Sequence, residues 1–419
     1  MNNKNFNYID LFAGAGGLSE GFKRSGFEAI AHVEMDKAAC YTLKTRIAYY
    51  HLKENNRIKD YIAYLEGKIT REELYSLIPS KILDTVINLP IGLENNETIF
   101  SKLDKHSSGR EIDLIVGGPP CQAYSLAGRS RSKDKMVADP RNYLFLQYAN
   151  YLQKYNPKMF VFENVLGLKS ANEGRYFKTM VTLFSNLGYE IADFILEADK
   201  HGVLQKRKRI ILIGHKRHLK LNVPDFESFE IKAKVSDIFA DLPSLNAGEG
   251  VNKYASYKCD GNPYVYDAKL RNGIEVLTQH VCRPNTKQDK EIYKIAVELW
   301  LNKNERLQYD NLPDNLKTHK NRTTFCDRFK VVAPELESSQ TVVAHIAKDG
   351  HYYIHPDIHQ NRSISVREAA RLQSFPDDFY FEGVKEGTSR TAAFKQIGNA
   401  VPPLMAERIA IYIKRLLQA

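Results

Sequence analysis

The chain contains 419 residues, 43% of them hydrophobic and 26% charged, a balance typical of a globular protein with two or three domains. No apolar run approaches the ~20 residues of a membrane-spanning helix, and the N-terminal stretch lacks the apolar segment of a signal peptide, so we expect a cytoplasmic protein. The five cysteines form no CxxC pair, which argues against a structural zinc site, and we expect no bound metal. Lys and Arg outnumber Asp and Glu by 60 to 50, and the resulting charge of +10 permits a polyanionic partner without requiring one.

A strand followed by a glycine-rich turn is predicted near the N-terminus. Residues 8–12 form the apolar strand and residues 13–17, Ala-Gly-Ala-Gly-Gly, form the turn that leads into a helix. Small residues let a ligand approach the backbone, and a helix N-terminus favours an acidic ligand group. A second strand at 29–33 ends in Glu34, the position at which such folds bind ribose hydroxyls. The turn does not match GxGxxG, so a dinucleotide is not favoured, and a single nucleoside such as that of S-adenosylmethionine (AdoMet) fits as well.

Residues 51–110 predict two surface helices and a third strand. Helical spacing of apolar residues marks the first helix at 58–65. Thr70 and Glu73 have the spacing of a capping box and begin the second helix. The third strand is expected at 86–91, with Pro90 near its end.

A cysteine follows a rigid turn after the fourth predicted strand. The apolar residues 112–116 lead into Gly117-Gly118-Pro119-Pro120 and then Cys121. The prolines force the chain out of the sheet at the strand's carboxyl end, which is where open α/β sheets place their chemistry. Cys121 is therefore either a nucleophile or a buried structural cysteine, and this stretch alone favours neither.

Charged side chains follow two later strands. Glu163 and Asn164 come directly after the apolar strand at 157–162, and the carboxylate either shares a proton with a substrate or caps the next helix. Arg207 and Arg209 precede another buried strand, and strand alternation places them on one face, where they hold an anion or a carbonyl group or form a solvated edge.

Beyond residue 243 the regular alternation of strands and helices fades into turns rich in glycine, asparagine and tyrosine. We interpret this part as a second, irregular domain that presents contact loops. Order returns at 364–373, and the apolar spacing at 405–417 predicts a final amphipathic helix that returns to the first domain.

Together these stretches resemble the DNA (cytosine-5)-methyltransferase family, in its bacterial restriction–modification form. Six blocks occur in the family's order and spacing across almost the whole chain. They span residues 10–22, 117–128, 160–168, 205–214, 362–379 and 396–410.

The resemblance implies a reaction mechanism and a role for each catalytic residue. Cys121 attacks C6 of cytosine, which makes C5 nucleophilic enough to take the methyl group of AdoMet. Glu163 binds the N3/N4 edge of the base, Arg209 holds O2 with support from Arg207, and Asn164 orients the loop that carries Cys121.

The resemblance also implies an AdoMet pocket. Glu34 holds the ribose, Met35 packs on the adenine, and the acid that many relatives carry after strand three has no clear counterpart, with Pro90 in its place. The remaining implied cofactor residues are Phe12, Ala13, Gly14, Gly16, Gly17, Leu18, Pro119, Asn399 and Val401.

The implied fold is a Rossmann-like α/β methyltransferase domain with a mixed, mainly parallel sheet and helices on both faces. We place it at 1–242, completed by 395–419, with a smaller irregular, β-rich target-recognition domain and hinge at 243–394. The implied partner is double-stranded DNA, bound by a monomer whose basic loop at 129–135 closes on the phosphates, with a separate restriction endonuclease as a further partner. An RNA cytosine-5 methyltransferase and an inactive DNA-binding relative remain the alternatives, whereas an oxidoreductase is disfavoured by the absence of GxGxxG.

Overall fold

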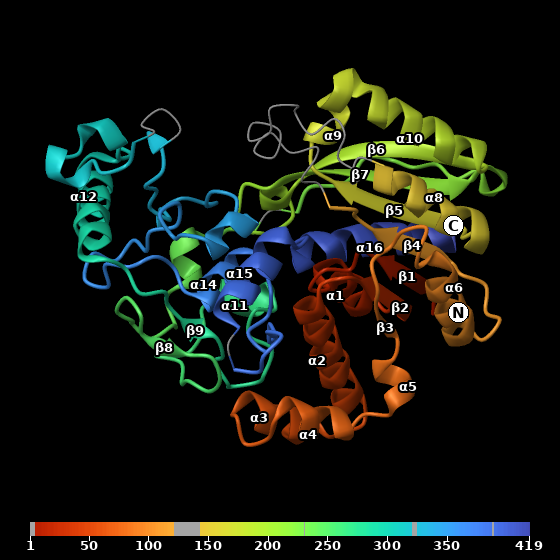
Figure 1. Ribbon diagram of the computed structural model, residues 1–419, viewed down its shortest axis with the longest axis horizontal. Helices are drawn as coiled ribbons and strands as arrows, with labels where there is room; N and C mark the ends of the chain where they lie inside the picture. Colours follow the sequence, from red (N-terminus) through yellow and green to blue (C-terminus); the bar gives the residue numbers. More distant parts are fainter. Residues whose placement is uncertain (1–4, 121–142, 230, 321–324, 388) are drawn as a thin grey trace.

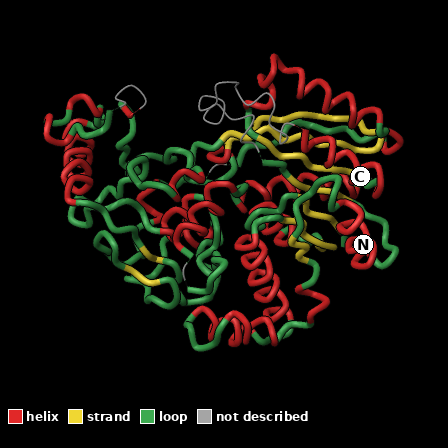
Figure 2. The backbone as a smooth tube through the Cα atoms, viewed as in Figure 1, coloured by secondary structure: helices red, strands yellow, loops and turns green. Residues whose placement is uncertain are grey.

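The computed structural model describes residues 5–120, 143–229, 231–320, 325–387 and 389–419. Cys121 and the basic segment 129–135 lie outside these residues. Figure 2 shows the long strands gathered with several helices in the right-hand half of the molecule, whereas the left-hand half consists of helices, loops and one short strand pair.

Seven strands of the described chain form one sheet, in the order β3-β2-β1-β4-β5-β7-β6 (Figure 1). The first five strands in this order are parallel, whereas β7 runs antiparallel to both β5 and β6. The expectation of a mixed, mainly parallel sheet is confirmed. The strands are β1 (Asn7–Leu11), β2 (Glu28–Glu34), β3 (Val86–Asn88), β4 (Leu114–Gly117), β5 (Met159–Asn164), β6 (Tyr189–Glu197) and β7 (Lys208–Lys216).

Helices pack on both faces of the sheet (Figure 1). In the described parts of the chain, none of them combines the length and apolar character needed to span a bilayer. The α-helices are α1 (Gly17–Arg24), α2 (Lys37–Glu54), α3 (Ile58–Leu65), α4 (Arg71–Ser76), α5 (Ser80–Leu83), α6 (Asn96–Ser107), α8 (Leu144–Tyr155), α9 (Gly167–Ser170), α10 (Arg175–Asn186), α11 (Pro263–Asp267), α12 (Lys287–Lys303), α14 (Val366–Leu372), α15 (Arg390–Asn399) and α16 (Pro403–Gln418).

Alternation along the central strands divides the core into two layers. Leu114 and Val116 of β4 face the cluster that contains α1 and α16, whereas Ile115 between them faces the cluster beneath α8 and α10. Because side chains on a strand alternate between its two faces, a strand buried on both sides is apolar throughout, as β4 is.

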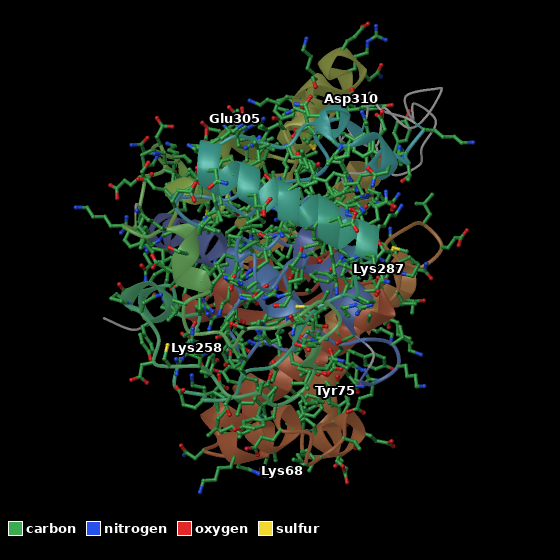
Figure 3. The ribbon with its side chains drawn as sticks, turned by 90° about the vertical axis from the view of Figure 1, so that its left-hand side faces the viewer. Lys68, Tyr75, Lys258, Lys287, Glu305 and Asp310 are labelled. Carbon is green, nitrogen blue, oxygen red and sulfur yellow. The ribbon has the colours of Figure 1, made fainter. Side chains whose placement is uncertain are left out.

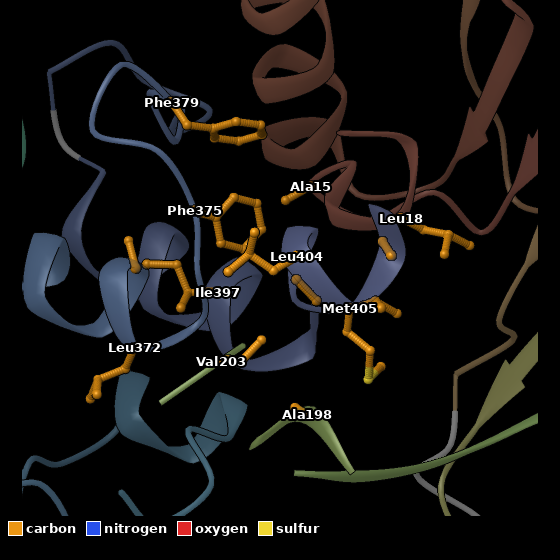
Figure 4. Close-up of a cluster of buried hydrophobic side chains, with 14 of the residues drawn as sticks. Ala15, Leu18, Ala198, Val203, Leu372, Phe375, Phe379, Ile397, Leu404 and Met405 are labelled. Carbon is orange, nitrogen blue, oxygen red and sulfur yellow. The ribbon is translucent and has the colours of Figure 1, made fainter. Parts of the chain in front are cut away.

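The final helix returns to the first strand–helix unit, as predicted. A Cβ atom at Gly17 would lie 2.2 Å from the carbonyl oxygen of Val401, and one at Gly21 would lie 2.3 Å from the backbone nitrogen of Glu407. These two glycines therefore let α1 and the chain around the start of α16 approach backbone to backbone. Figure 4 shows Leu18 of α1 beside Leu404 and Met405 of α16 in the shared core.

Helices α3, α4 and α5 form an extension of α2 that reaches the second half of the chain. The Thr70–Glu73 capping box predicted from the sequence is present at the start of α4. Tyr61 and Tyr64 of α3 are fully buried in a cluster that also contains Ile274 and Tyr380. The extension packs one face against this distant part of the sequence, while Lys59, Glu72 and Glu73 stay exposed, so α3 and α4 are surface helices as predicted.

The region 243–394 is irregular, as expected, but it is not rich in β-structure. Its described residues contain one two-stranded ladder, formed by β8 (Gly250–Val251) and β9 (His280–Val281), and a few isolated bridges. Polar side chains satisfy its backbone where a sheet would otherwise do so: Arg367 donates to the carbonyl oxygens of Thr278, Pro376 and Phe379.

Only part of this region has a core of its own. Helix α12 and the chain around Phe329 and Ile354 form a separate cluster at one end of the molecule. Residues 264–270 and 364–381, in contrast, contribute to the same cluster as α1 and α16. Figure 3 views this end, with α12 crossing the upper part between Lys287 and Glu305 and the helices around Lys68 and Tyr75 below.

Acid should destabilise the junction of α1 and α2 through Glu20. Burial alone would raise the pKa of Glu20, but Arg46 and Arg24 lower it to about 2. Because the pKa is lower in the folded than in the unfolded chain, the stabilisation is complete above the ordinary pKa of 4.5 and is lost as the pH falls towards 2. Urea unfolding between pH 3 and 6 should show this loss, and Glu20→Gln should flatten the profile; an equally steep profile in the variant would contradict it.

Candidate active site

The carboxyl ends of four neighbouring strands bring the predicted site residues together. Leu11 of β1 lies beside Gly117 of β4, which in turn pairs with Phe162 of β5. Glu34, the last residue of β2, pairs with Asn88 of β3. The gap between β1 and β4 is where the strand order changes direction, and open α/β sheets bind ligands at such a point.

The two glycines after β4 are required by close packing. A Cβ atom at Gly117 would lie 2.2 Å from the carbonyl oxygen of Leu11. A Cβ atom at Gly118 would lie 2.6 Å from Oε2 of Glu163. The Glu163 carboxylate is therefore packed directly against the turn that leads to Cys121, and no larger residue fits between them.

Glu163 and Arg209 form an ion pair at this edge. Nε of Arg209 lies 2.8 Å from Oε1 of Glu163, and the two side chains are 13% and 15% exposed. Arg209 also donates to the carbonyl oxygen of Lys208 over 2.7 Å. The pair is partly shielded from water yet open to a ligand, so both groups are held in place while their remaining polar atoms can contact a substrate.

Asn164 links the same strand to the proline turn. Its side-chain amide donates to the carbonyl oxygen of Pro119 over 3.2 Å, and its Oδ1 accepts from the backbone N–H of Val165. These contacts tie the end of β5 to Pro119, two residues before Cys121, and the orienting role of Asn164 stays a prediction.

The buried cysteines of the described chain are poor nucleophiles. Burial raises the pKa of Cys40 to about 12, and it raises the pKa of Cys282 to about 12 as well. Since the thiolate is the reactive form, neither residue competes with Cys121 for that role. No group of three His, Cys, Asp or Glu side chains within the described ranges is arranged to hold a metal ion.

The Arg207 side chain has buried partners of its own, and its support of Arg209 stays a prediction. Its side chain is fully buried and donates to the carbonyl oxygens of Val342, Gly398 and Ala400. Arg207 directly precedes β7, and the predicted alternation is kept: Lys206 and Lys208 are exposed, whereas Arg207 is buried and Arg209 is partly buried. It is a positioning residue that fixes the backbone on both sides of Asn399.

The glycine-rich turn and Glu34 form a cradle. The backbone N–H of Gly14 donates to Oε2 of Glu34 over 2.7 Å, and that of Asp36 donates to Oε1 over 2.7 Å. Burial raises the pKa of Glu34, and these two N–H groups oppose the rise. A Cβ atom at Gly14 would meet nothing within 4 Å, so the space above the turn is open. A carboxylate, free backbone space and an adjacent helix N-terminus fit a nucleoside that carries an amino-acid tail.

The other residues expected to bind the cofactor differ in backbone conformation and in how exposed their side chains are. Phe12 has φ of 57°, a conformation that is rare for an aromatic residue and marks strain at the start of the turn. Met35 is 65% exposed beside Glu34, and Asn399 is exposed at the end of α15. The Leu18 side chain is buried in the core (Figure 4), so only its backbone remains for a ligand.

The remaining residues expected to bind the cofactor have small or buried side chains. Gly17 and Val401 are in backbone contact, which places the 399–401 segment against the turn. The carbonyl oxygen of Pro119 accepts a hydrogen bond from Asn164. Ala13 is buried with Cys40, and Gly16 has φ of 85° directly before α1.

Asn88 was not among the site residues predicted from the sequence. It ends β3 level with Glu34, and its side-chain amide donates to the carbonyl oxygens of Glu34 and Met35, over 3.0 Å each. The strand ends there, two residues before Pro90, so Asn88 rather than Pro90 stands at the carboxyl end of strand three. The sequence did offer a signal: a polar residue ends a short apolar strand, next to a strand that ends in an acid.

Known proteins resemble this chain over its whole length. A family model described as C-5 cytosine-specific DNA methylase matches residues 6–68 and 91–415. The Type II methyltransferase M.Bpa9945I of Bacillus paralicheniformis is 40% identical, covering 97% of this chain and 98% of the relative. The Type II methyltransferase M1.HphI of Haemophilus parahaemolyticus is 29% identical, covering 96% and 85%.

A solved structure of a candidate DNA modification methyltransferase from an E. coli prophage shares the fold, with a TM-score of 0.65 and 23% identity over 99% of this chain and all of that one. The Entamoeba histolytica methyltransferase EhMeth aligns with a TM-score of 0.54 and 16% identity over the full length of both chains. Because this family model matches most of the chain's residues, the chain belongs to the C-5 cytosine-specific DNA methylase family.

Proposed function

We propose that this DNA cytosine-5 methyltransferase is a site-specific Type II enzyme that modifies a cytosine flipped out of duplex DNA and so protects DNA from a separate restriction endonuclease. The observation that carries the proposal is the Glu163–Arg209 ion pair, packed against the turn that leads to Cys121. The named Type II relatives support the restriction–modification setting.

AdoMet is the cofactor that the cradle fits, and when bound it supplies the methyl group. Glu34 would hold the ribose hydroxyls, with Met35 and Asn88 at the adenine end. The helix N-terminus at Gly16 and Gly17 and the segment around Asn399 would enclose the remainder. Phe12, Ala13, Gly14 and Val401 would shape the walls, with the Leu18 contribution limited to its backbone.

The protein's own groups activate the base. Cytosine C5 is a weak nucleophile, and a bond from the Cys121 thiolate to C6 turns C5 into an enamine carbon. Glu163 would hydrogen-bond the N3/N4 edge and deliver a proton to N3, while Arg209 would hold O2, so that both draw charge out of the ring. After methyl transfer, a water molecule would take the C5 proton and the C6–sulfur bond would break to release the Cys121 thiolate. N3 would return its proton to Glu163, which restores the aromatic ring.

The DNA should lie across the edge that carries the catalytic pair. Lys206 and Lys208 are exposed beside Arg209, and the overall charge of +10 favours a phosphate backbone. We propose that residues 1–242 and 395–419 form the catalytic domain and that residues 243–394 contain target recognition. Within the latter, the separately packed lobe around α12 is the part best able to adapt to a particular sequence.

Expression in a methylation-free bacterial host tests this function. Whole-genome cytosine-conversion sequencing should show protected cytosines within one short motif, because the enzyme modifies a fixed site. Cys121→Ala should leave every cytosine convertible, since no bond to C6 can form.

Two other outcomes would contradict parts of the proposal. Protection that persists in Cys121→Ala would contradict the assigned nucleophile. Soluble protein that binds AdoMet but protects no genomic cytosine would contradict the DNA-methylating function and point to an RNA substrate or an inactive DNA-binding protein.

A further inference from the structure

The family model leaves out one internal segment, and the structure shows a specific use for it. Residues 69–90 fall between the two matched ranges and contain α4, α5 and β3. The start of α4 contacts residues 382–386, which lead from the second half of the chain into α15. We name residues 382–386 the connector.

Arg71, the first residue of α4, makes most of these contacts. Nη1 donates to the carbonyl oxygen of Gly383 over 2.7 Å and lies 3.4 Å from Oε2 of Glu382. Nη2 donates to the carbonyl oxygen of Val384 over 3.1 Å, and the backbone N–H of Arg71 donates to Oε1 of Glu386 over 2.8 Å. The guanidinium carbon lies 3.8 Å from the ring centre of Tyr41 on α2, and the side chain is only 12% exposed.

The connector is in turn tied to α15. Gln396 of α15 donates to the carbonyl oxygen of Glu382 over 2.9 Å. The hydroxyl of Thr42 accepts from the backbone N–H of Glu382 and donates to Oε1 of Gln396. The Glu382 carboxylate is buried and accepts from Thr45 of α2 over 2.7 Å and from Tyr64 of α3.

Helix α15 borders the cradle. Lys395 pairs with Asp36 over 2.7 Å, two residues after Glu34, and α15 ends at Asn399. A shift of the connector would therefore move both the Lys395–Asp36 contact and the segment 399–401 that lies against the glycine-rich turn.

We propose that Arg71 is a positioning residue for the AdoMet pocket, which holds the connector and through it α15 in register with Glu34. The inference rests on the proposed cofactor. Its physical basis is the planar guanidinium, which reaches two carbonyl oxygens at once while stacking on Tyr41, a combination that lysine cannot reproduce.

The place of Arg71 separates it from the substrate. Figure 1 shows α3 and α4 at the end of the molecule away from α12 and from the β5–β7 edge, and Figure 3 shows Lys68 and Tyr75 below α12. Arg71 therefore acts on the cofactor pocket through the connector rather than by contact with DNA.

Calorimetric titration of the full-length protein with AdoMet tests the proposal. Arg71→Met should raise the AdoMet Kd about tenfold, because charge-assisted hydrogen bonds to the connector are lost. Arg71→Lys should show a smaller rise. Arg57→Met is the matched control, because Arg57 lies on the same extension and forms an ion pair with Asp60 while about half exposed. The AdoMet Kd of this variant should equal that of the wild type.

The binding of a DNA duplex, measured without AdoMet, and the melting temperature of the free protein separate positioning from a general loss of structure. In Arg71→Met, DNA binding should remain near its wild-type value, and the melting temperature should stay well above the temperature of the binding assay. An unchanged AdoMet Kd, or a parallel loss of AdoMet and DNA binding with a lowered melting temperature, would overturn the proposal.

If Arg71→Met does not fold, Glu386→Ala carries the test, since it removes the acceptor of the Arg71 backbone N–H from the other side. It should raise the AdoMet Kd by a smaller factor, and an unchanged value would overturn the proposal. Failure of the wild-type protein to bind AdoMet would instead reject the proposed cofactor.

Discussion

Glu163→Gln should lower the rate of methyl transfer about 100- to 10,000-fold, the range over which a positioned proton donor or acceptor contributes to catalysis. Glutamine has the size of glutamate and can still hydrogen-bond the base, but it cannot deliver a proton to N3. Arg209, 2.8 Å away, also loses the charge that holds it. Single-turnover transfer of a labelled methyl group to a duplex that contains the target site measures the effect on chemistry.

The control for this variant is Glu190→Gln. Glu190 lies on β6 with its side chain 66% exposed, so its rate should match the wild type. Both proteins should bind AdoMet with unchanged Kd, because Glu163 is not part of the cradle. A loss of less than tenfold in Glu163→Gln would show that base activation does not depend on this carboxylate.

Arg371→Met should destabilise the protein by about 3–5 kcal/mol, the usual consequence of removing one partner from a buried ion pair. The Arg371 guanidinium lies between two buried carboxylates, with Nη2 3.0 Å from Oδ2 of Asp241 and Nε 2.9 Å from Oδ1 of Asp377. Burial alone would raise the pKa of Asp377, but Arg371 holds it below its ordinary value, so this carboxylate is charged at neutral pH. Without Arg371 the Asp377 charge is left without this partner in a site that water does not reach.

Urea unfolding at pH 7 measures the loss. Arg57→Met again provides the comparison, since its ion pair with Asp60 is exposed and should contribute no more than about 1 kcal/mol. If the two variants were equally stable, the Arg371 network would not hold the second half of the chain to the core.

Much of the local structure follows from the sequence because its causes are local. The apolar runs of β1, β4 and β5 and the heptad-like spacing of α16 bury their side chains in the way that their periods predict. The capping box at Thr70 needs only residues three apart. Strand β6, in contrast, was not predicted, because this edge strand of Tyr189–Glu197 is only partly buried and lacks a clear apolar period.

The functional site also has features that follow from the sequence and features that only the tertiary structure shows. The sequence by itself determined which residues are candidates, since those at 121, 163, 164 and 209 stand next to predicted turns and strands, while their catalytic roles come from the family resemblance and stay predictions. Only the tertiary structure decided that Arg207 braces the backbone around Asn399, that Leu18 belongs to the core, and that Arg71 reaches the connector. These roles depend on contacts between segments more than a hundred residues apart, or on which face of an element is buried, and neither is encoded in the local order of residues.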